Sequence, residues 1–324
     1  MYLITGSAGF IGFHLSLTLL KKGHHVIGLD SINNYYDKKI KYDRLKILKK
    51  FKNFRFLKID LSKQNIIYKK IKKFVNKIEI IIHLAGQAGV RYSIINPNAY
   101  INDNILSHVN LLECFKKSKK IKLILYASSS SVYGEKNSNN SASSSPQVNP
   151  ISVYSASKLS MELISKSYNS LYNLKSIGLR FFSVYGPWGR PDMFYYKFLK
   201  HILNNKPISI FNYGNHKRSF TYIDDAILNI LKIVKKFKNN KNNVCDVFNI
   251  GNPNSISLKK LILVLEKKIK KKAVKKYIKK NPEEVIMTKA SIIREKKIFN
   301  HEINVTLESG VEKFVDWYKK YTAA

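Results

Sequence analysis

The chain has 324 residues, of which 44% are hydrophobic, and a formal net charge of +37, so it can bury the core of one large α/β domain or two coupled ones. Its two cysteines, Cys114 and Cys245, lie far apart without CxxC or metal-ligand spacing, which argues against a disulfide scaffold or a metal site. No stretch is apolar enough to span a membrane and no secretory signal is visible, so we expect a soluble, cytoplasmic protein.

Short apolar runs alternate with helical periodicity through the first half of the chain. The predicted strands are Tyr2–Thr5, Val26–Asp30, Phe54–Ile59, Ile78–Leu84, Lys122–Ser128 and Ser176–Phe182. The predicted helices are Gly12–Lys22, then residues 37–51, 63–76, 98–118 and 152–172. Strands separated by helices imply right-handed crossovers, so we predict an α/β fold with a Rossmann-type, doubly wound parallel sheet.

The pattern changes after Tyr185, where a loop rich in Gly and Pro begins. Short strands and helices follow without regular alternation, which indicates a smaller α/β substrate-binding domain. We place the first domain at 1–183 and the second mainly at 184–324, with a strand near 247–250 returning to the main sheet. The Asn- and Ser-rich stretch 137–145 is predicted to be a surface loop.

A glycine loop, Gly-x-x-Gly-x-x-Gly at Gly6, Gly9 and Gly12, lies between the first strand and the first helix. Glycine permits the tight turn and the close approach of a pyrophosphate, and the helix N-terminus faces the phosphates. Asp30 ends the second strand, where a carboxylate accepts hydrogen bonds from the ribose hydroxyls of NAD and repels the 2′-phosphate of NADP. The sequence therefore predicts an NAD site.

Tyr154 and Lys158 form a Tyr-x-x-x-Lys motif at the start of a predicted helix. Their spacing puts both side chains on one helix face, where the ammonium favours the phenolate and makes the tyrosine a usable base. A serine run that includes Ser129 follows the fifth strand, at the edge where parallel sheets bind ligands. We predict that Ser129, Tyr154 and Lys158 are catalytic.

These features resemble the extended short-chain dehydrogenase/reductase family, which is the NAD-dependent epimerase/dehydratase family, and within it the UDP-glucuronate 4-epimerases. The more specific segments are Asp30–Asp37, His83–Ser93, Arg180–Met193, Arg218–Asp225 and Gly310–Tyr318. The resemblance covers nearly the whole chain. It implies that 1–183 is the NAD-binding domain and that 184–324 is mainly the domain for the UDP-sugar substrate. It implies inversion at C4 of UDP-glucuronate to UDP-galacturonate, through a transient 4-keto intermediate with bound NAD.

The resemblance also implies roles for individual residues. Those expected to bind NAD are Gly6, Gly9, Phe10, Ile11, Gly12, Asp30, Asn34, Asp60, Leu61, Leu84, Ala85, Gly86, Asn104, Tyr154, Lys158 and Phe181. Those expected to bind the substrate are Arg91, Ser129, Ser130, Ser131, Ser183, Arg190, Arg218 and Glu284. Arg190 suits a uronate because its planar fork binds a carboxylate through two hydrogen bonds, although it could instead be a structural ion-pair partner.

Several alternatives remain open. A related decarboxylase carries Glu two positions after the catalytic hydroxyl, where this chain has Ser131, and a related dehydratase carries an acidic pair beside its catalytic Thr. A 4-epimerase of UDP-glucose or UDP-N-acetylglucosamine is another alternative, but Arg190 in the segment Gly-Pro-Trp-Gly-Arg argues against a neutral sugar. The high positive charge suggests a non-catalytic nucleotide- or RNA-binding protein, but the lysines form runs along helices and no nucleic-acid motif accompanies them. We therefore predict no nucleic-acid or membrane partner, and a homodimer that pairs the helices at 98–118 and 152–172.

Overall fold

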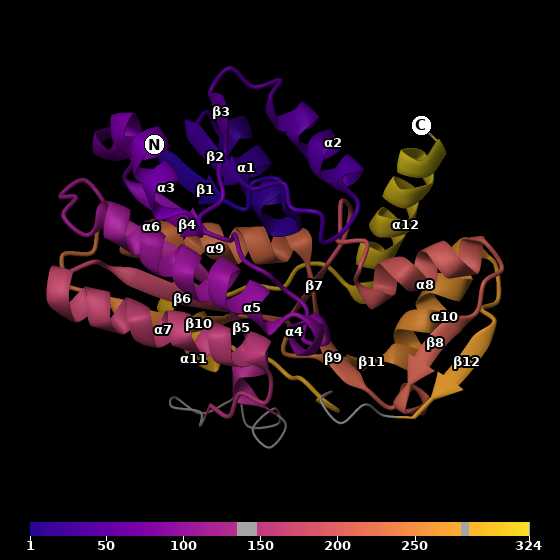
Figure 1. Cartoon of the computed structure of the whole chain (residues 1–324). Helices are drawn as coiled ribbons and strands as arrows, with labels where there is room; N and C mark the ends of the chain where they lie inside the picture. Colours follow the sequence, from indigo (N-terminus) through magenta and orange to yellow (C-terminus); the bar gives the residue numbers. More distant parts are fainter. Residues whose placement is uncertain (135–147, 280–284, 324) are drawn as a thin grey trace. The chain divides into compact units, whose positions relative to one another are not determined.

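The structure is a computed structural model that describes residues 1–134, 148–279 and 285–323 (Figure 1). The chain forms two compact units that interleave along the sequence. The first unit contains Met1–Val132, Pro150–Phe181 and Ile230–Phe248. The second unit contains those described residues that fall within 133–149, 182–229 and 249–324. The chain therefore returns to the first unit twice, and a boundary at residue 183 remains a prediction.

Seven strands of one parallel sheet lie in the order β10-β6-β5-β4-β1-β2-β3. Their bounds are β1 Tyr2–Thr5, β2 Val26–Asp30, β3 Phe54–Lys58, β4 Ile80–His83, β5 Leu123–Ser129, β6 Ser176–Phe181 and β10 Cys245–Ile250. Strands β1, β4 and β6 are buried along their whole length, as expected for apolar strands covered on both faces. The Rossmann-type fold is thereby confirmed, with the strand order reversing between β1 and β4, where such sheets bind ligands.

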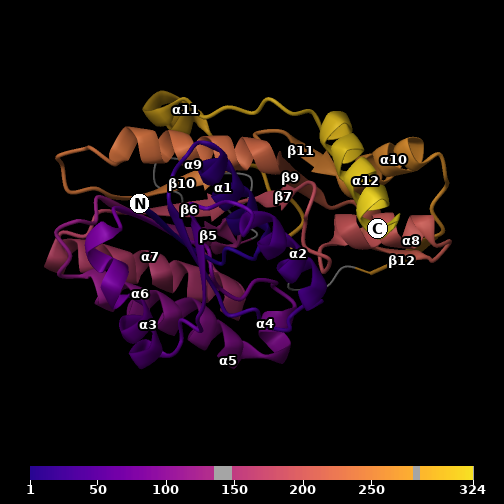
Figure 2. The same cartoon turned by 90° about the horizontal axis from the view of Figure 1, so that it is seen from above.

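Helices connect these strands and cover the sheet. They are α1 Phe10–Lys21, α2 Lys38–Leu48, α3 Gln64–Ile71, α4 Tyr92–Ile95, α5 Pro97–Tyr100, α6 Ser107–Phe115, α7 Val153–Tyr172 and α9 Ile223–Phe237. Figure 2 shows α3, α6 and α7 side by side along one face of the strands. On α9, Phe237 packs against Phe248 of β10, with ring centroids 5.7 Å apart.

The helix predicted at 98–118 is interrupted, which corrects the sequence-based expectation. A π-helical segment, Ile101–Leu106, separates α5 from α6. Such insertions widen a helix by one residue and occur often at functional sites. Here the insertion contains Asn104, whose side chain is completely buried.

Helix α7 has an unusual distribution of polar and apolar residues. Ser152 caps its first turn by accepting the N–H of Ser155, and Asn173 ends it in the left-handed region at φ 54°. Met161 is the one apolar residue among its buried positions, which are Ser155, Ser157, Lys158, Met161, Glu162, Ser165 and Asn169. Leu163 and Leu171 are instead 60% and 71% exposed. Polar contacts therefore hold much of this helix against the rest of its unit, together with Ile164 and Tyr168, which pack partly buried against the apolar core.

The second unit contains two small sheets. One has the order β11-β9-β7 and the other pairs β12 with β8. Their bounds are β7 Ser183–Tyr185, β8 Ile208–Phe211, β9 Lys217–Tyr222, β11 Ser255–Ser257 and β12 Lys275–Ile278. The helices are α8 Phe194–Leu203, α10 Leu258–Ile269, α11 Ile293–Phe299 and α12 Leu307–Ala323. Rings from α8 and α12 contribute to its core, including Tyr195 against Phe314, with ring centroids 5.2 Å apart.

Among the residues that the structure describes, no helix has the length and apolar character needed to cross a membrane.

Candidate active site

The glycine loop after β1 is closed so tightly that its glycines leave no room for side chains. The backbone N–H of Gly9 donates to the carbonyl of Gly6 at 2.9 Å. Gly6 has φ +67°, and a Cβ there would lie 2.8–2.9 Å from backbone atoms of Leu84 and Ala85. No side chain caps α1 at Gly9, so the first N–H groups of this helix face outward, as an anion-binding loop requires.

Asp30 at the end of β2 is held rigidly by two backbone N–H groups. Its Oδ2 accepts from Ala8 of the glycine loop at 3.0 Å, and its Oδ1 accepts from Ile32 at 2.8 Å. Ile32 has φ 54°, a strained conformation for a β-branched residue, and this turn directs its N–H to the carboxylate. Each carboxylate oxygen can accept a further bond, so Asp30 can still bind the two ribose hydroxyls of a dinucleotide.

Asn104 presents a buried acceptor inside the predicted cofactor groove. Its Nδ2 donates to the carbonyl of Gln87 at 3.1 Å and to Ser157 Oγ at 2.8 Å. Its Oδ1 is buried and has no hydrogen-bond partner among the described residues. A Cβ on Gly86 would lie 2.5 Å from that Oδ1 and 3.2 Å from Lys158 Nζ. The vacant acceptor therefore faces Gly86 and Lys158, where a cofactor hydroxyl could donate to it.

The remaining predicted cofactor residues lie in the same unit. Asp60 follows β3, and its Oδ1 accepts from the N–H and hydroxyl of Ser62. The carbonyl of Leu61 accepts from Asn110 Nδ2 at 2.9 Å. Phe181 ends β6 and is 9% exposed, whereas Asn34 lies exposed after β2.

The predicted catalytic residues come from the end of β5 and the first turns of α7. Because α7 leads directly into β6, its N-terminus lies at the carboxyl edge of the sheet, the edge where β5 ends at Ser129. Ser129 Oγ accepts from the N–H of Ser131 at 3.2 Å and from its hydroxyl at 2.9 Å. The proton of Ser129 can therefore be donated to a substrate oxygen. The ring of Tyr154 packs edge-on against Tyr100, with centroids 5.9 Å apart.

Lys158 is 4% exposed, and burial lowers its pKa to about 8. Its Nζ lies 3.6 Å from the Sδ of Met161, a weak acceptor. An ammonium with few strong acceptors pays a large desolvation cost, which is the physical cause of the lowered pKa. At neutral pH the charge is still mostly present, so Lys158 can support a phenolate at Tyr154.

Two buried histidines, His83 and His108, lie close enough to Lys158 to interact with its charge. His83 at the end of β4 stacks on His108 of α6 with centroids 5.3 Å apart, and both rings are fully buried. Burial, with a contribution from Lys158, lowers the pKa of His108 to about 3 and that of His83 well below its usual value. His83 is therefore a packed, neutral residue.

Sequence reasoning missed two residues of this cluster. Thr5 Oγ1 lies 2.7 Å from His83 Nδ1 and accepts the N–H of Ala85 at 3.0 Å, so it ties β1 to β4 beside the glycine loop. Its position directly before Gly6 was the available signal. His108 had none, because its ring meets His83 only after the strands and helices have packed.

The predicted substrate-binding residues come from several elements of the chain. Ser183 begins β7, Arg91 lies exposed before α4, and Ser130 and Ser131 follow β5. Arg218 Nη1 on β9 donates to the carbonyls of Lys217 and Ile286, each at 3.0 Å. Glu284 lies outside the described residues. Their distances from Tyr154, and their roles, remain predictions.

Arg190 is engaged by a neighbouring carboxylate. Its Nε and Nη2 donate to the two oxygens of Asp192 at 3.0 and 2.5 Å. This is the structural ion pair that sequence reasoning held as the alternative to uronate binding. A uronate would therefore compete with Asp192 for these two nitrogens.

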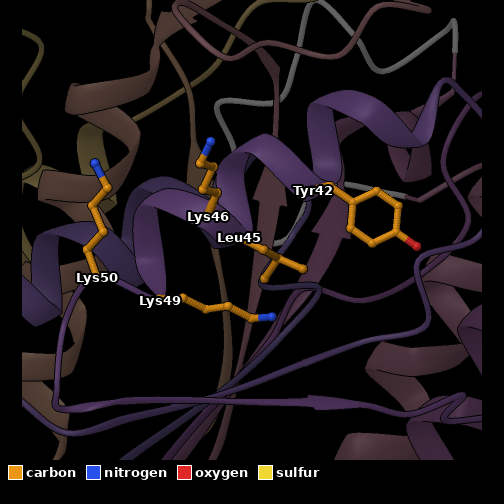
Figure 3. A pocket seen from close by; sticks show the side chains of 5 residues that line it. All are labelled: Tyr42, Leu45, Lys46, Lys49 and Lys50. Carbon is orange, nitrogen blue, oxygen red and sulfur yellow. The ribbon is translucent and has the colours of Figure 1, made fainter.

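A hollow of about 360 Å³ lies on the outer face of α2, away from these residues (Figure 3). Figure 3 shows Lys46 and Lys50 pointing to one side of the helix, whereas Lys49 points to another, with its Nζ 5.8 Å from the ring centroid of Phe56. The lining residues are Tyr42, Leu45, Lys46, Lys49 and Lys50, and none belongs to the predicted site. Within the described ranges, no group of His, Cys, Asp and Glu is arranged to hold a metal ion.

Comparison with known proteins identifies the class that this site defines. Residues 2–251 match the NAD dependent epimerase/dehydratase family, and the chain belongs to that family. The glycine cradle, Asp30 and the vacant acceptor of Asn104 fit its cofactor, NAD.

The chain is also similar to individual members of the family. The chain is 44% identical to protein CapI of Staphylococcus aureus, over 98% of each chain. It is 39% identical to UDP-glucuronate 4-epimerase of Thermodesulfobacterium geofontis, over 98% of this chain and 96% of that protein. Its structure resembles UDP-glucuronic acid 4-epimerase from Bacillus cereus in complex with UDP-glucuronic acid and NAD. The TM-score is 0.90 and the identity 33%, over 99% of each chain.

Proposed function

We propose that this protein is an NAD-dependent UDP-glucuronate 4-epimerase, which inverts C4 of UDP-glucuronate to give UDP-galacturonate. The observation that carries the proposal is the placement of the glycine loop, Asp30 and the Tyr154/Lys158 pair in one unit, at the carboxyl edge of one sheet. Full-length similarity to two proteins that bear this activity in their names supports the same substrate.

The residues of the chain would share the proton chemistry. When bound, NAD supplies a reversible two-electron oxidation at C4, so that a transient 4-keto sugar forms. Tyr154 removes the proton of the 4-hydroxyl and later returns it, while Ser129 donates a hydrogen bond to the same oxygen. The Lys158 ammonium stabilises the phenolate of Tyr154. The keto sugar turns over between the two half-reactions and is reduced from its opposite face.

Retention of the carboxylate is the second requirement, because a 4-keto uronate is a β-keto acid that readily loses CO₂. We propose that Arg190 and the hydroxyls of Ser130, Ser131 and Ser183 hold the carboxylate out of alignment with the carbonyl π system. Ser131 stands where a decarboxylase of the family carries Glu. Arg190 would exchange Asp192 for the uronate, or bind both through different nitrogens of its guanidinium. Arg218 would meet the diphosphate.

The decisive experiment is incubation of purified protein with UDP-glucuronate and separation of the products. UDP-galacturonate is the expected product, and UDP-pentose as the main product would assign a decarboxylase instead. Parallel reactions with UDP-glucose and UDP-N-acetylglucosamine test the neutral-sugar alternative. A gel shift with random RNA at physiological salt tests the nucleic-acid alternative, because purely electrostatic binding weakens steeply as salt rises.

We further propose that the protein is a cytoplasmic homodimer that buries the outer face of α6 and α7. Leu163 and Leu171 are strongly exposed on α7, and Leu106 directly before α6 is 40% exposed. Exposed leucines of this kind favour a protein contact over water. Leu163→Glu should give a monomer in analytical ultracentrifugation. The matched control is Leu263→Glu on α10, which is 56% exposed and should leave the assembly unchanged.

A further inference from the structure

A buried ion pair joins the catalytic helix to two strands of the sheet. Arg180 of β6 donates from Nε and Nη2 to Oε1 and Oε2 of Glu162 on α7, at 2.9 and 2.6 Å. Ser128 of β5 donates its hydroxyl to Oε1 of the same carboxylate at 2.5 Å. The three residues are 6%, 8% and 2% exposed. One carboxylate therefore binds α7, β5 and β6 together through three charge-assisted hydrogen bonds.

Stability alone is a poor explanation for this arrangement. Taking two charges out of water costs about as much as their attraction returns, and well-packed apolar residues are often as stable. Unlike apolar packing, the ion pair is directional, because two parallel hydrogen bonds between a guanidinium and a carboxylate fix the relative position of the two side chains. Further along α7, Ser165 contacts His108 at 2.8 Å and Asn169 donates to the carbonyl of Leu174 at 3.0 Å. Directional contacts thus continue along the inward face of α7, beside the apolar packing of Met161, Ile164 and Tyr168.

The position of the ion pair connects it to the predicted chemistry. Glu162 lies one helical turn after Lys158 and two turns after Tyr154, on the same face of α7. Ser128 directly precedes Ser129, the last residue of β5. Any sliding or rotation of α7 against β5 would move the phenol and the Ser129 hydroxyl relative to each other. Both must reach the same substrate oxygen.

We infer that Glu162, bound by Arg180 and Ser128, is a positioning residue that sets the register of Tyr154 and Lys158 against Ser129. The inference rests on the proposed function of these three residues. Glu162 touches neither substrate nor cofactor in this account, and it acts through the helix and strand that it joins. Removing its directional bonds should therefore lower the rate of the chemical step and leave NAD binding intact.

The test must separate positioning from folding. Glu162→Gln alone would leave the Arg180 charge buried without its partner and could unfold the protein. The double variant Glu162→Met/Arg180→Met replaces both charges by apolar side chains of similar length and should fold. The control is Lys260→Gln/Glu308→Gln, which removes an exposed ion pair of 3.5 Å and should keep the wild-type kcat.

The expected result is a kcat lower by about 10- to 100-fold in the apolar variant, with unchanged Kd for NAD and thermal stability near wild type. A wild-type kcat in that folded variant would overturn the inference. If the double variant does not fold, Ser128→Ala decides, since it keeps the ion pair and removes only the bond to β5. It should lower kcat several-fold without changing KM, and an unchanged kcat would count against the inference.

A crystal structure of the apolar variant supplies a measurement that does not depend on turnover. The distance between Ser129 Oγ and the Tyr154 hydroxyl should change by more than about 0.5 Å, the tolerance of a productive site. Atoms that superpose on the wild type would overturn the inference even if the protein proved to act on another substrate. Absence of epimerisation by the wild-type protein would instead refute the proposed function, so the two failures are distinguishable.

Discussion

Replacement of Lys158 by methionine should stabilise the cofactor-free protein while it abolishes turnover. Burial lowers the pKa of Lys158 from 10.5 to about 8, so folding carries the cost of desolvating its ammonium. A shift of that size corresponds to about 3 kcal/mol, at 1.4 kcal/mol per pH unit. Methionine has nearly the same length and needs no hydration, so it recovers most of this cost. The variant is expected to be more stable because the buried lysine is kept for catalysis although it destabilises the fold.

The pH dependence of this stability gain shows whether it comes from the desolvation of Lys158. Between about pH 8 and 10.5 the unfolded chain holds the lysine proton and the folded chain does not, so the stability of the wild type rises with pH in this window. Below pH 8 both states are protonated and the full cost is present. The gain from Lys158→Met should therefore be about 3 kcal/mol at pH 7 and should vanish as the pH approaches 10.5.

Urea unfolding at several pH values between 7 and 10 measures this difference, since packing changes contribute equally at each pH and cancel. The control is Lys166→Met, the same substitution at an exposed position of the same helix, which should show neither the gain nor its pH dependence. A gain that is constant with pH would refute the assignment to desolvation, and a loss of stability at pH 7 would refute the whole argument.

Further expectations concern the base, the glycine loop and the buried histidines. Tyr154→Phe should nearly abolish turnover while NAD still binds by calorimetry, and an active variant would remove Tyr154 from the role of base. Gly6→Ala should weaken NAD binding at least tenfold, because its Cβ would meet backbone atoms within 3 Å. Gly23→Ala is the control, since Gly23 has φ +79° but open space around it, and it should leave NAD affinity unchanged. Below pH 6.5 the two histidines are protonated in the unfolded chain but stay neutral in the folded protein. The free energy of unfolding should therefore fall by about 1.4 kcal/mol per pH unit for each histidine. His108→Phe should reduce the loss between pH 7 and 5 by about 2 kcal/mol in urea unfolding. An unchanged slope would mean that this histidine is protonated in the folded state.

The sequence predicted β1 and β2 with the bounds that the structure has, because a fully buried parallel strand is a continuous apolar run between breakers. It also predicted α7 within one residue at its start, because Ser152 is a good N-cap. The π-helical insertion at Ile101–Leu106 escaped prediction. Its residues keep helical periodicity, and the partners of Asn104, the carbonyl of Gln87 and the hydroxyl of Ser157, come from other parts of the chain.

The state of the site residues was less predictable than their identity. Tyr-x-x-x-Lys places two side chains on one helix face whatever surrounds that helix, since the period is local. The degree to which Lys158 is desolvated depends on every element that covers it. Arg190 shows the same limit, because its type indicated carboxylate binding without indicating which carboxylate. In the structure the partner is Asp192, two residues away.

By itself the sequence determined the alternating architecture, the glycine loop and the residue types of the catalytic set, because each follows from spacing over a few residues. Tertiary structure decided which groups lose water and which distant groups they meet. Burial of Lys158, the stacking of His83 on His108 and the fork between Glu162 and Arg180 all arise only when helices and strands pack against one another. Electrostatic free energies depend on that surrounding medium and on those distances, and neither is a property of a local pattern.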